Sequence, residues 1–423
     1  MTFTAPINSD RLLERFLRYV QIDTTANADN ADYPSSPGQI ALGKMLADEL
    51  RAMGASQVEH DEHGLVWATI PANVPYGITH SVPTVLFNAH LDTSPEAVGA
   101  GVRPQVIQAY VGGDIPLPCD ARVIKVADCP ALKDLVGHCL ITSDGTTLLG
   151  GDDKAGVAAI MELAQHLLEQ PHLPHGEVRV LFTCDEEIGR GAQHMDLDRA
   201  NALVGYTLDG GGQGEVEAEN FSADQLLVRA IGNNIHPSLG KGRMVNAVRG
   251  LALLLAELPL AQLAPESTEG REGFLHPYDV RGGVQTAEAR ILLRDFDTLR
   301  LDDYEQMVRT AADAVAAKMP GLKFHIDRQR QYRNMADAIR KMPQVVEFAA
   351  LAWEHLSVDY EVGSIRGGTD GAQFSEMGLP TPNLSVGQHN IHSVLEFASL
   401  DQMVASIKHA VKLLELWQAH GVS

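Results

Sequence analysis

Histidine and acidic residues follow several short apolar segments of this sequence. Those segments are rich in β-branched residues and are bounded by turn-forming residues, which predicts buried strands. In parallel α/β sheets, sites form just beyond the carboxyl ends of the strands, where loops from several strands meet. The side chains that this pattern brings together are His90 and Asp92 after TVLFN, Glu186 and Glu187 after EVRVLFT, Asp209 after LVGYTL, His392 in the loop after NLSVG, and Asp152 at the start of a predicted helix in LLGGDDKAG.

This combination of residue types predicts a site for two metal ions. Burying several carboxylates together is costly unless cations neutralise them. Imidazole and carboxylate ligands without thiolate suit zinc, with cobalt or manganese as substitutes. Two histidines and three carboxylates can hold two ions with one carboxylate bridging them, an arrangement that serves hydrolysis.

The other acidic residues at these strand ends fit supporting roles. Asp92 lies two residues beyond His90, so on an extended segment it shares the same side and could orient the imidazole. Of the adjacent Glu186 and Glu187, one carboxylate can bind metal while the other takes a proton from metal-activated water. The spacing leaves open which glutamate has which role, and which aspartate of GGDDKAG is the ligand.

Alternating helices and strands must position these residues, which predicts an α/β fold. A first helix is expected with Ser9-Asp10 as its cap, and a second over about 37–53 that ends before Gly54. Further helices are predicted at about 156–168, 343–356 and 399–420, and strands at 64–70, 84–88, 177–183 and 202–208. The stretch 93–140 is rich in Pro, Gly and Asp and is predicted to be a long, irregular excursion from the sheet.

A glycine run at 210–212 marks the start of a second structural unit. Between 215 and 331 the predicted order is strand, helix, strands, helix and strand, which suits a two-layer α+β domain of the ferredoxin-like kind. We therefore expect a catalytic domain made of 1–214 and 332–423, with three layers around a central mixed, mostly parallel sheet. The α+β domain, 215–331, is inserted into it.

Composition and charge exclude several classes of protein. The 423 residues are 45% hydrophobic and 21% charged, which is an ordinary globular composition for a chain of at least two structural units. The formal net charge of −22 argues against a nucleic-acid partner. The first residues lack the pattern of a secretion signal, no apolar run is long enough to span a bilayer, and four cysteines suit a reducing compartment. We expect no membrane partner and a cytoplasmic location.

Eight segments of the sequence resemble signature blocks of the M20 metallopeptidases. They are NAHLDTSP (88–95), LLGGDDKAG (148–156), FTCDEEIG (182–189), YTLDGGG (206–212), GNNIHP (232–237), RDFD (294–297), IRGGTDGAQFSEMGLPTPNL (365–384) and NIHSVLEF (390–397). Within this family, GGDIPL (112–117), the DTSP turn and TLLGGDDKAG point to aminopeptidases that act on tripeptides. The resemblance therefore implies a di-zinc enzyme that releases the N-terminal residue of short peptides, chiefly tripeptides.

The resemblance also implies which residues bind each metal ion. It makes Asp152 the bridging carboxylate, with a cis peptide bond after it. It gives His90 and Asp209 to one zinc ion, and Glu187 and His392 to the other. This assignment agrees with the spacing of the residues and removes the ambiguity that spacing alone leaves.

Catalytic roles follow from the same resemblance. Glu186 becomes the general base, and Asp92 the residue that orients the histidine. The inserted domain resembles a lid that closes over the substrate, in which His236 supplies a hydrogen bond or positive charge to the reacting carbonyl. Relatives of this fold include dimers that associate through the lid, so a homodimer of this chain is one expected state.

Three further residues are candidates for binding the substrate. Arg294 and Arg366 could hold a terminal carboxylate, because a guanidinium group matches it with two parallel hydrogen bonds. An ordinary salt bridge is the alternative interpretation of each arginine. Asn334 is a candidate because it lies where the chain returns to the catalytic domain.

Two other classes of function remain open at this point. The same two-zinc machinery serves dipeptidases, carboxypeptidases and deacylases of N-acyl amino acids, because contacts to the substrate termini set specificity. A non-catalytic, metal-containing binding protein is an alternative of another class, although a free base at Glu186 would have no use in it. The sequence has no G-x-S-x-G element of a serine hydrolase and no dinucleotide fingerprint at 210–214.

Overall fold

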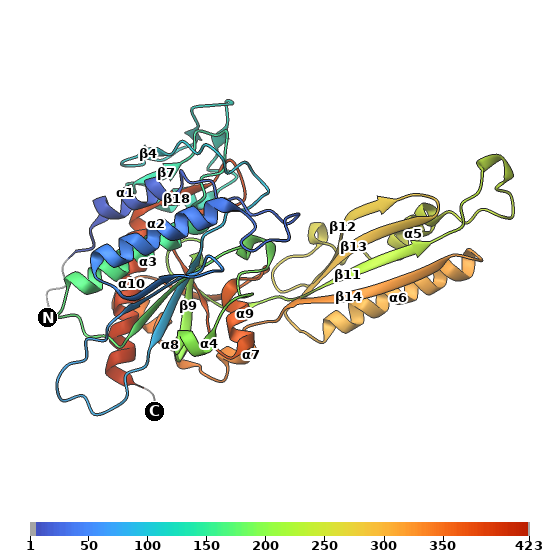
Figure 1. Cartoon of the computed structure of the whole chain (residues 1–423). Coiled ribbons are helices and arrows are strands. Elements are labelled where there is room, and N and C mark those ends of the chain that lie inside the picture. The colour runs from blue at the N-terminus through green and yellow to red at the C-terminus, as the bar shows by residue number, and fades with distance from the viewer. Residues whose placement is uncertain (1–5, 422–423) are drawn as a thin grey trace. The chain divides into compact units, whose positions relative to one another are not determined.

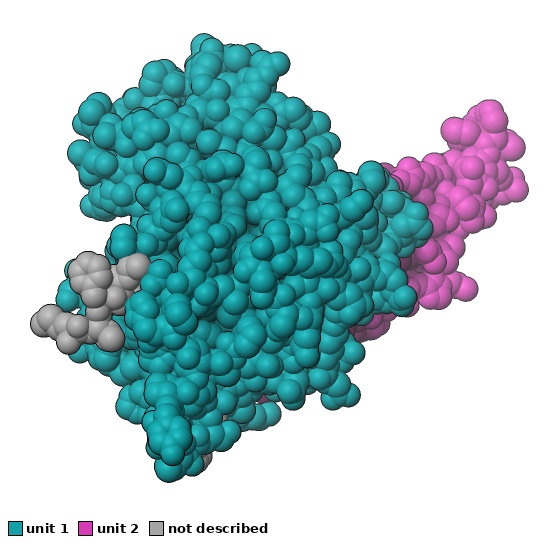
Figure 2. Space-filling view, turned by 60° about the vertical axis from the view of Figure 1, so that its left-hand side comes forward, with its two compact units in different colours: residues 1–218, 337–363, 369–423 teal, residues 219–336, 364–368 magenta. Residues whose placement is uncertain are grey.

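A computed structural model of the chain describes residues 6–421 (Figure 1). The chain forms two compact units: the first contains Met1–Ala218, Asp337–Gly363 and Thr369–Ser423, and the second contains Glu219–Ala336 and Ser364–Gly368 (Figure 2). The first five and last two residues, which the predicted catalytic domain includes, lie outside the described residues. No helix among residues 6–421 has the length and apolar composition that crossing a membrane requires.

The first unit is built around an eight-stranded mixed sheet. Its strands are β1 (Ser56–His60), β2 (Val66–Ile70), β3 (Val85–His90), β8 (Val178–Thr183), β9 (Val204–Gly210), β10 (Glu215–Asn220), β15 (Glu361–Ile365) and β16 (Asn383–Ser385). Their order is β1-β2-β8-β3-β9-β16-β10-β15. The four central strands β8, β3, β9 and β16 run parallel to one another. Strand β2 is antiparallel to both of its neighbours, β1 and β8, and strand β10 is antiparallel to β16. The α/β class with a mixed, mostly parallel sheet is therefore confirmed.

Helices cover both faces of this sheet. The helices of this unit are α1 (Ser9–Tyr19), α2 (Pro37–Met53), α3 (Gly151–Glu169), α4 (Leu197–Ala200), α7 (Ala336–Ile339), α8 (Gln344–His355), α9 (Asp370–Met377) and α10 (Leu400–His420), with the short η1 (Pro130–Leu135) and η2 (Glu186–Ile188) away from the faces of the sheet. Leu86 of β3 packs with apolar residues of α4 and α9. The next residue, Phe87, points to the opposite face and stacks on Tyr206, whose hydroxyl group bonds with Val345 in α8 and Trp417 in α10. The sheet is thus the middle of three layers.

Local sequence explains where the first two helices begin and end. The helix α2 has Pro37 in its first turn, and Gly54 ends it in the left-handed conformation at φ +93°. The predicted cap of α1 at Ser9-Asp10 is wrong by one residue. Asn8 is the cap, and its side-chain oxygen accepts the N–H of Arg11. Three good capping residues stand in a row here, so local preference could not choose between them.

The segment 93–140 is more ordered than its composition predicts. It contains β4 (Gln105–Ile107), β5 (Ile115–Pro116), β6 (Val123–Ile124) and, at its end, β7 (Leu140–Thr142). Its apolar residues form a cluster with Phe397. A small sheet of order β17-β18-β7-β4 joins it to β17 (Gln388–His389) and β18 (Phe397–Ser399). This sheet places the loop that contains His392 beside the chain that leads to Asp152.

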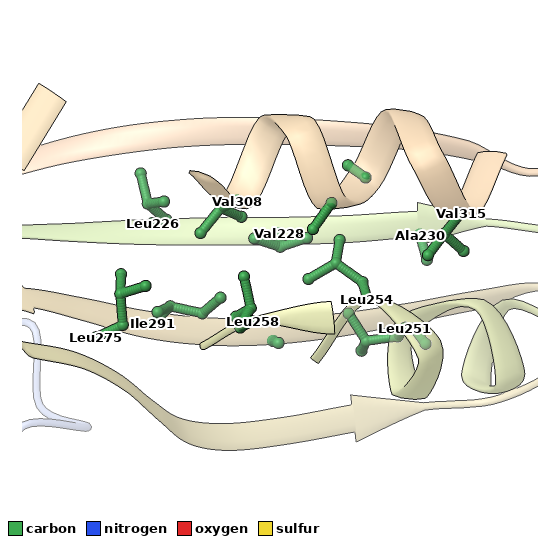
Figure 3. Packing of buried hydrophobic residues seen from close by; sticks show 14 of the residues in the cluster. Leu226, Val228, Ala230, Leu251, Leu254, Leu258, Leu275, Ile291, Val308 and Val315 are labelled. Carbon is green, nitrogen blue, oxygen red and sulfur yellow. The ribbon is translucent and has the colours of Figure 1, made fainter. Parts of the chain in front are cut away.

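The second unit is a two-layer α+β structure. Its elements are β11 (Ser222–Ile231), η3 (Pro237–Leu239), α5 (Ala247–Glu257), η4 (Pro265–Ser267), β12 (Phe274–Gly282), β13 (Thr286–Asp295), α6 (Arg300–Lys318) and β14 (Lys323–Tyr332). The antiparallel sheet has the order β12-β13-β11-β14, which is the ferredoxin-like arrangement. Figure 3 shows its core, where Leu254 of α5 and Val308 of α6 pack with Leu226 and Val228 of β11.

Replacing Leu254 by alanine should destabilise the second unit by about 2–5 kcal/mol, because a fully buried leucine is removed from its core. The neighbouring Leu253 is 38% exposed, so Leu253→Ala is a matched control with an expected effect within about 0.5 kcal/mol. Urea denaturation followed by hydrogen exchange of peptides from β11 and α5 measures both changes. Equal effects of the two substitutions would contradict this packing.

Candidate metal centre and active site

The parallel strands place the predicted residues at one edge of the first unit's sheet. His90 is the last residue of β3, and Asp209 is the last but one of β9. Glu186 and Glu187 open the short helix η2, which follows β8. Because β8, β3 and β9 are parallel neighbours, their carboxyl ends meet at the same edge.

Two groups of potential metal ligands share one carboxylate, that of Asp152. One group is His90, Asp152 and Asp209, the other is Asp152, Glu187 and His392, and the ligand atoms in each group lie within 4.8 Å of one another. Asp152 Oδ1 is 3.0 Å from His90 Nε2, while its Oδ2 is 3.3 Å from His392 Nε2. His90 Nε2 is also 3.7 Å from Asp209 Oδ1, and His392 Nε2 is 2.9 Å from Glu187 Oε2. The two oxygens of Asp152 thus face different histidines, and the peptide bond after it is cis.

The histidines and Asp152 stabilise each other's charged forms. Burial lowers the pKa of His392, but hydrogen bonds with Asp152 and Glu187 raise it to about 11. Burial also opposes protonation of His90, and hydrogen bonds with Asp152 and Asp209 raise its pKa well above the usual value. Despite its own burial, Asp152 has a lowered pKa because both histidines bond to it. This shared carboxylate is therefore the most strongly ionised acid of the site.

The other acidic residues of the site are poorly stabilised as anions. Burial and the nearby Asp152 raise the pKa of Glu187 to about 8. Burial raises the pKa of Glu186, and burial together with Asp152 raises that of Asp209. Glu187 Oε1 is buried and has no hydrogen-bond partner among the residues that the structure describes. A set of nitrogen and oxygen donors with this excess of buried negative charge fits two divalent cations.

Asp92 contacts both the histidine and the glutamate pair. Its main-chain oxygen lies 3.1 Å from His90 Nδ1, and its Oδ1 lies 3.4 Å from the same nitrogen. Its two carboxylate oxygens accept the main-chain N–H groups of Glu186 and Glu187 at 3.0 and 3.1 Å. Sequence spacing predicted the contact of Asp92 with His90, but not its contacts with Glu186 and Glu187. Asp92 thus fixes the segment that carries the glutamates as well as the imidazole.

Asp185 holds the turn between β8 and η2 and was not among the predicted residues. It adopts the left-handed conformation at φ +61°, which is uncommon for a residue other than glycine. Its carboxylate accepts hydrogen bonds from Ser35 N, Ser35 Oγ and Gln39 Nε2 at 2.6–2.8 Å. The adjacent acidic run CDEE is the only local signal that could have drawn attention to it.

Two amide side chains that the sequence did not single out support Asp209. Gln388 Nε2 donates to Asp209 Oδ1 at 3.0 Å, and Asn383 Oδ1 accepts the main-chain N–H of Asp209 at 3.1 Å. Asn383 also donates to Glu217 at 2.6 Å. Amide residues are common in loops and strand ends, so their types carried no signal without the strand order that places them here.

Both candidate arginines belong to the second unit. The Arg294 guanidinium group lies 5.3 Å from the ring centre of Tyr332 and donates to main-chain oxygens. That of Arg366 lies over Phe221 and Phe274 and donates to Gly270 O and Thr268 Oγ1. Within the described part of the chain, neither arginine forms an ion pair with a carboxylate. Among residues 6–421, the alternative of an ordinary salt bridge therefore finds no partner for either arginine.

The second unit separates His236 from the other three candidates. Arg294 lies opposite Ala223 at the beginning of β11, and Asn334 N donates to Ser222 Oγ there. Arg366 lies over Phe274, which is paired with Arg294. His236 follows the other end of this ten-residue strand, roughly 33 Å away at the usual rise per residue, and its exposed ring bonds with Ser238. In Figure 1 the segment between β11 and α5 lies at the far end of β11 from its start.

Sequence comparison assigns the chain to a family of peptidases. The model of peptidase family M20/M25/M40 matches residues 147–416, more than half of the chain. The chain belongs to this family. Among its relatives, peptidase T of Geobacillus sp. (strain WCH70) is 41% identical over 410 residues, which cover 97% of this chain and 99% of the relative.

Solved structures share the fold over nearly the whole chain. A tripeptidase from Staphylococcus aureus matches with a TM-score of 0.77 at 23% identity, over 98% of this chain and 100% of that chain. The Bacillus subtilis YXEP protein, a dinuclear metal-binding peptidase from the M20 family, matches with a TM-score of 0.63 at 14% identity, over 96% of this chain and 98% of that one. At these identities the similarity shows the fold alone.

The protein stripped of metal should lose stability as the pH rises from about 4.5 towards 8. In that range the folded chain keeps a proton on Glu187 that the unfolded chain has released, because the folded pKa is about 8 and the ordinary value is 4.5. Stability falls with pH wherever the folded state binds more protons, by up to about 1.4 kcal/mol per pH unit for one proton. The raised pKa of His392 acts in the same direction at higher pH.

Chemical denaturation of chelator-treated protein at several pH values measures this slope. Glu187→Gln is the control, since it removes the titrating group and should flatten the slope. A metal-free protein that is more stable at pH 8 than at pH 5 would contradict the proton balance described for this site.

Proposed function

We propose that this chain is a two-metal aminopeptidase that removes the N-terminal residue from short peptides, chiefly tripeptides. The observation that carries the proposal is the position of Asp152, whose two oxygens face His90 and His392 and so join two ligand groups. Glu186 immediately precedes one of those ligands, Glu187. The similarity to peptidase T over nearly the full length supports the choice of substrate.

The two ligand groups divide the metal ions between them. His90 and Asp209 would hold one ion, Glu187 and His392 the other, with Asp152 bridging. The donor set of imidazole and carboxylate suits zinc, and cobalt or manganese could replace it. The dinuclear centre of the Bacillus subtilis relative is consistent with two ions in this fold.

The chain's own residues would carry the proton transfers. When bound, the metal ions supply Lewis acidity that polarises the peptide carbonyl and makes water a better nucleophile. Glu186 accepts the proton of the attacking water and delivers it to the nitrogen of the leaving amine. Asp92 keeps both Glu186 and His90 in place.

Residues of the second unit would bind the substrate. We assign the second unit, Glu219–Ala336 with Ser364–Gly368, as the inserted lid and dimerisation domain that the sequence placed at 215–331, and the first unit as the catalytic domain that it placed at 1–214 and 332–423. Arg294 and Arg366 would hold the terminal carboxylate, with Asn334 nearby. Each guanidinium group is placed by aromatic rings and main-chain oxygens rather than by a competing carboxylate, which leaves its charge available to an anion.

His236 would act on the same substrate from a second copy of the chain. A tripeptide spans only about 10 Å, whereas His236 and Arg294 lie at opposite ends of β11, roughly 33 Å apart. One chain therefore cannot place both side chains on one tripeptide. A homodimer through the second unit supplies His236 in trans, where it can stabilise the negative charge that develops on the carbonyl oxygen. The four unpaired cysteines favour a cytoplasmic location.

Replacing Glu186 by glutamine should keep both metal ions and reduce kcat by about two to four orders of magnitude, the usual contribution of a general base. Metal content and the rate of tripeptide cleavage measure the two effects, with dipeptides and N-acetylated tripeptides as comparison substrates. Near-normal turnover would refute the role of Glu186. Failure of the unaltered protein to cleave any tripeptide with a free amine would refute the aminopeptidase assignment.

Mixing two inactive variants tests the role of His236 in trans. Glu186→Gln and His236→Ala should each be inactive alone, yet a mixed dimer has one site with an intact Glu186 and a partner His236. After subunit exchange, about a quarter of all sites should be active if the two chains pair at random. Activity that stays at the level of the separate variants, while mixed dimers are demonstrably present, would contradict the proposal.

A further inference from the structure

A buried glutamate beside the metal ligands has no part in the proposed reaction. Glu396 lies four residues after His392 and is 1% exposed. Its Oε2 accepts the main-chain N–H groups of Leu149 and Gly150, both at 2.8 Å, and its Oε1 accepts that of Asp152 at 2.9 Å. One carboxylate thus satisfies three main-chain donors of the segment that enters α3.

The loop before α3 is shaped to receive an anion. Gly150 has the left-handed conformation at φ +81° and ψ +28°, which is readily available to glycine. Such a residue within a turn makes successive N–H groups converge into a concavity that binds anions. Here the anion is the Glu396 carboxylate of the same chain, bound by the main-chain N–H groups of Leu149, Gly150 and Asp152.

The small sheet of the first unit fixes Glu396 relative to this loop. The next residue, Phe397, begins β18 and is paired with Thr142 of β7, from which the chain continues to Asp152. The approach is close: a Cβ atom on Gly151 would lie 3.1 Å from Glu396 Oε1. The contact therefore depends on Gly150 and Gly151 at the start of α3, and on the pairing of β18 with β7 that positions Glu396.

We propose that Glu396 is a positioning residue that holds Asp152 between the two metal ions. The inference rests on the proposed function for the role of Asp152 as the bridging ligand. A ligand shared by two ions has to be correctly placed for both at once, within roughly 0.5 Å. Glu396 meets this need by fixing the main chain of Asp152, while its own loop carries His392. It therefore couples the position of the bridge to that of the second histidine.

A neutral side chain of the same size cannot replace this carboxylate. In Glu396→Gln the amide oxygen can accept the two N–H groups now bound by Oε2, but the NH2 group then faces the N–H of Asp152. Two donors repel each other, so Asp152 is released from the clamp. We expect metal dissociation constants to rise by about 10–100-fold and kcat to fall, as when other residues that support metal ligands are removed.

Glu162→Gln is the matched control for loss of a buried carboxylate. Glu162 is fully buried in the same helix and forms ion pairs with Arg11 and Arg15 at 2.7 and 2.8 Å. It lies ten residues beyond Asp152, which is roughly 15 Å along a helix. Its replacement should lower stability and leave metal affinity unchanged. Equal losses of metal affinity in the two variants would overturn the proposal.

Gly151→Ala disturbs the same contact from the other side and keeps every charge. The new methyl group crowds Glu396 Oε1, while its next neighbour, Ala398 Cβ, is at an ordinary 3.8 Å. This variant should fold and bind metal a few-fold more weakly, so it decides the question if Glu396→Gln does not fold. Wild-type metal affinity and kcat in every Glu396→Gln or Gly151→Ala protein that folds would overturn the role of Glu396.

Metal affinity is measured by competition with a chelator, and the visible absorption of the cobalt-loaded protein reports ligand geometry. Both readouts are independent of peptide cleavage. If the unaltered protein binds two ions but cleaves no tripeptide, the proposed function fails while these measurements still decide the role of Glu396. An unchanged cobalt spectrum in Glu396→Gln, together with an unchanged metal affinity, would contradict the positioning role of Glu396.

Discussion

Mutual repulsion among buried carboxylates is the constraint on which the first unit depends. Asp152, Glu187 and Asp209 lie within reach of two histidines, and Glu186 is next to them. Burial acts to raise the pKa of all four acids, and only for Asp152 do the hydrogen bonds of two imidazole rings outweigh burial and lower the pKa. Such an arrangement is stable only when bound protons or metal cations compensate the negative charge. The demand for cations is therefore a property of the fold before any substrate is considered.

Acidic and amide side chains that bind no metal hold the ligand-bearing segments in place. Asp92 accepts the main-chain N–H groups of the glutamate pair, Asn383 accepts that of Asp209, and Glu396 accepts that of Asp152. In each case the support acts on the main chain and leaves the ligand atoms free. Each of these ligand-bearing segments is thus fixed by a hydrogen-bond acceptor that lies far from it in the sequence.

The sequence predicted those features that have a strong local pattern. Fully buried, mainly apolar strands such as β3 and the parallel strand ends were predictable, because burial on both faces and convergence of loops follow from residue type and order. Edge strands such as β1 and β15 alternate polar residues at partly exposed positions and gave no such signal. Glu396 was missed because a glutamate in a loop has no local feature that identifies its partners. The separation of His236 from Arg294 depends on the full length of β11, which motifs alone do not report.

The ligands of the centre are spread over about seven tenths of the 423-residue chain, from His90 to His392. A ribosome completes the segments that carry His90, Asp152, Glu187 and Asp209 first, then the entire second unit, and only afterwards the loop with His392 and Glu396. Folding during synthesis proceeds from the N-terminus. The growing chain therefore contains a half-built centre with unbalanced negative charge until its last tenth emerges. The complete centre, and with it any hydrolytic activity, becomes possible only when synthesis is nearly finished.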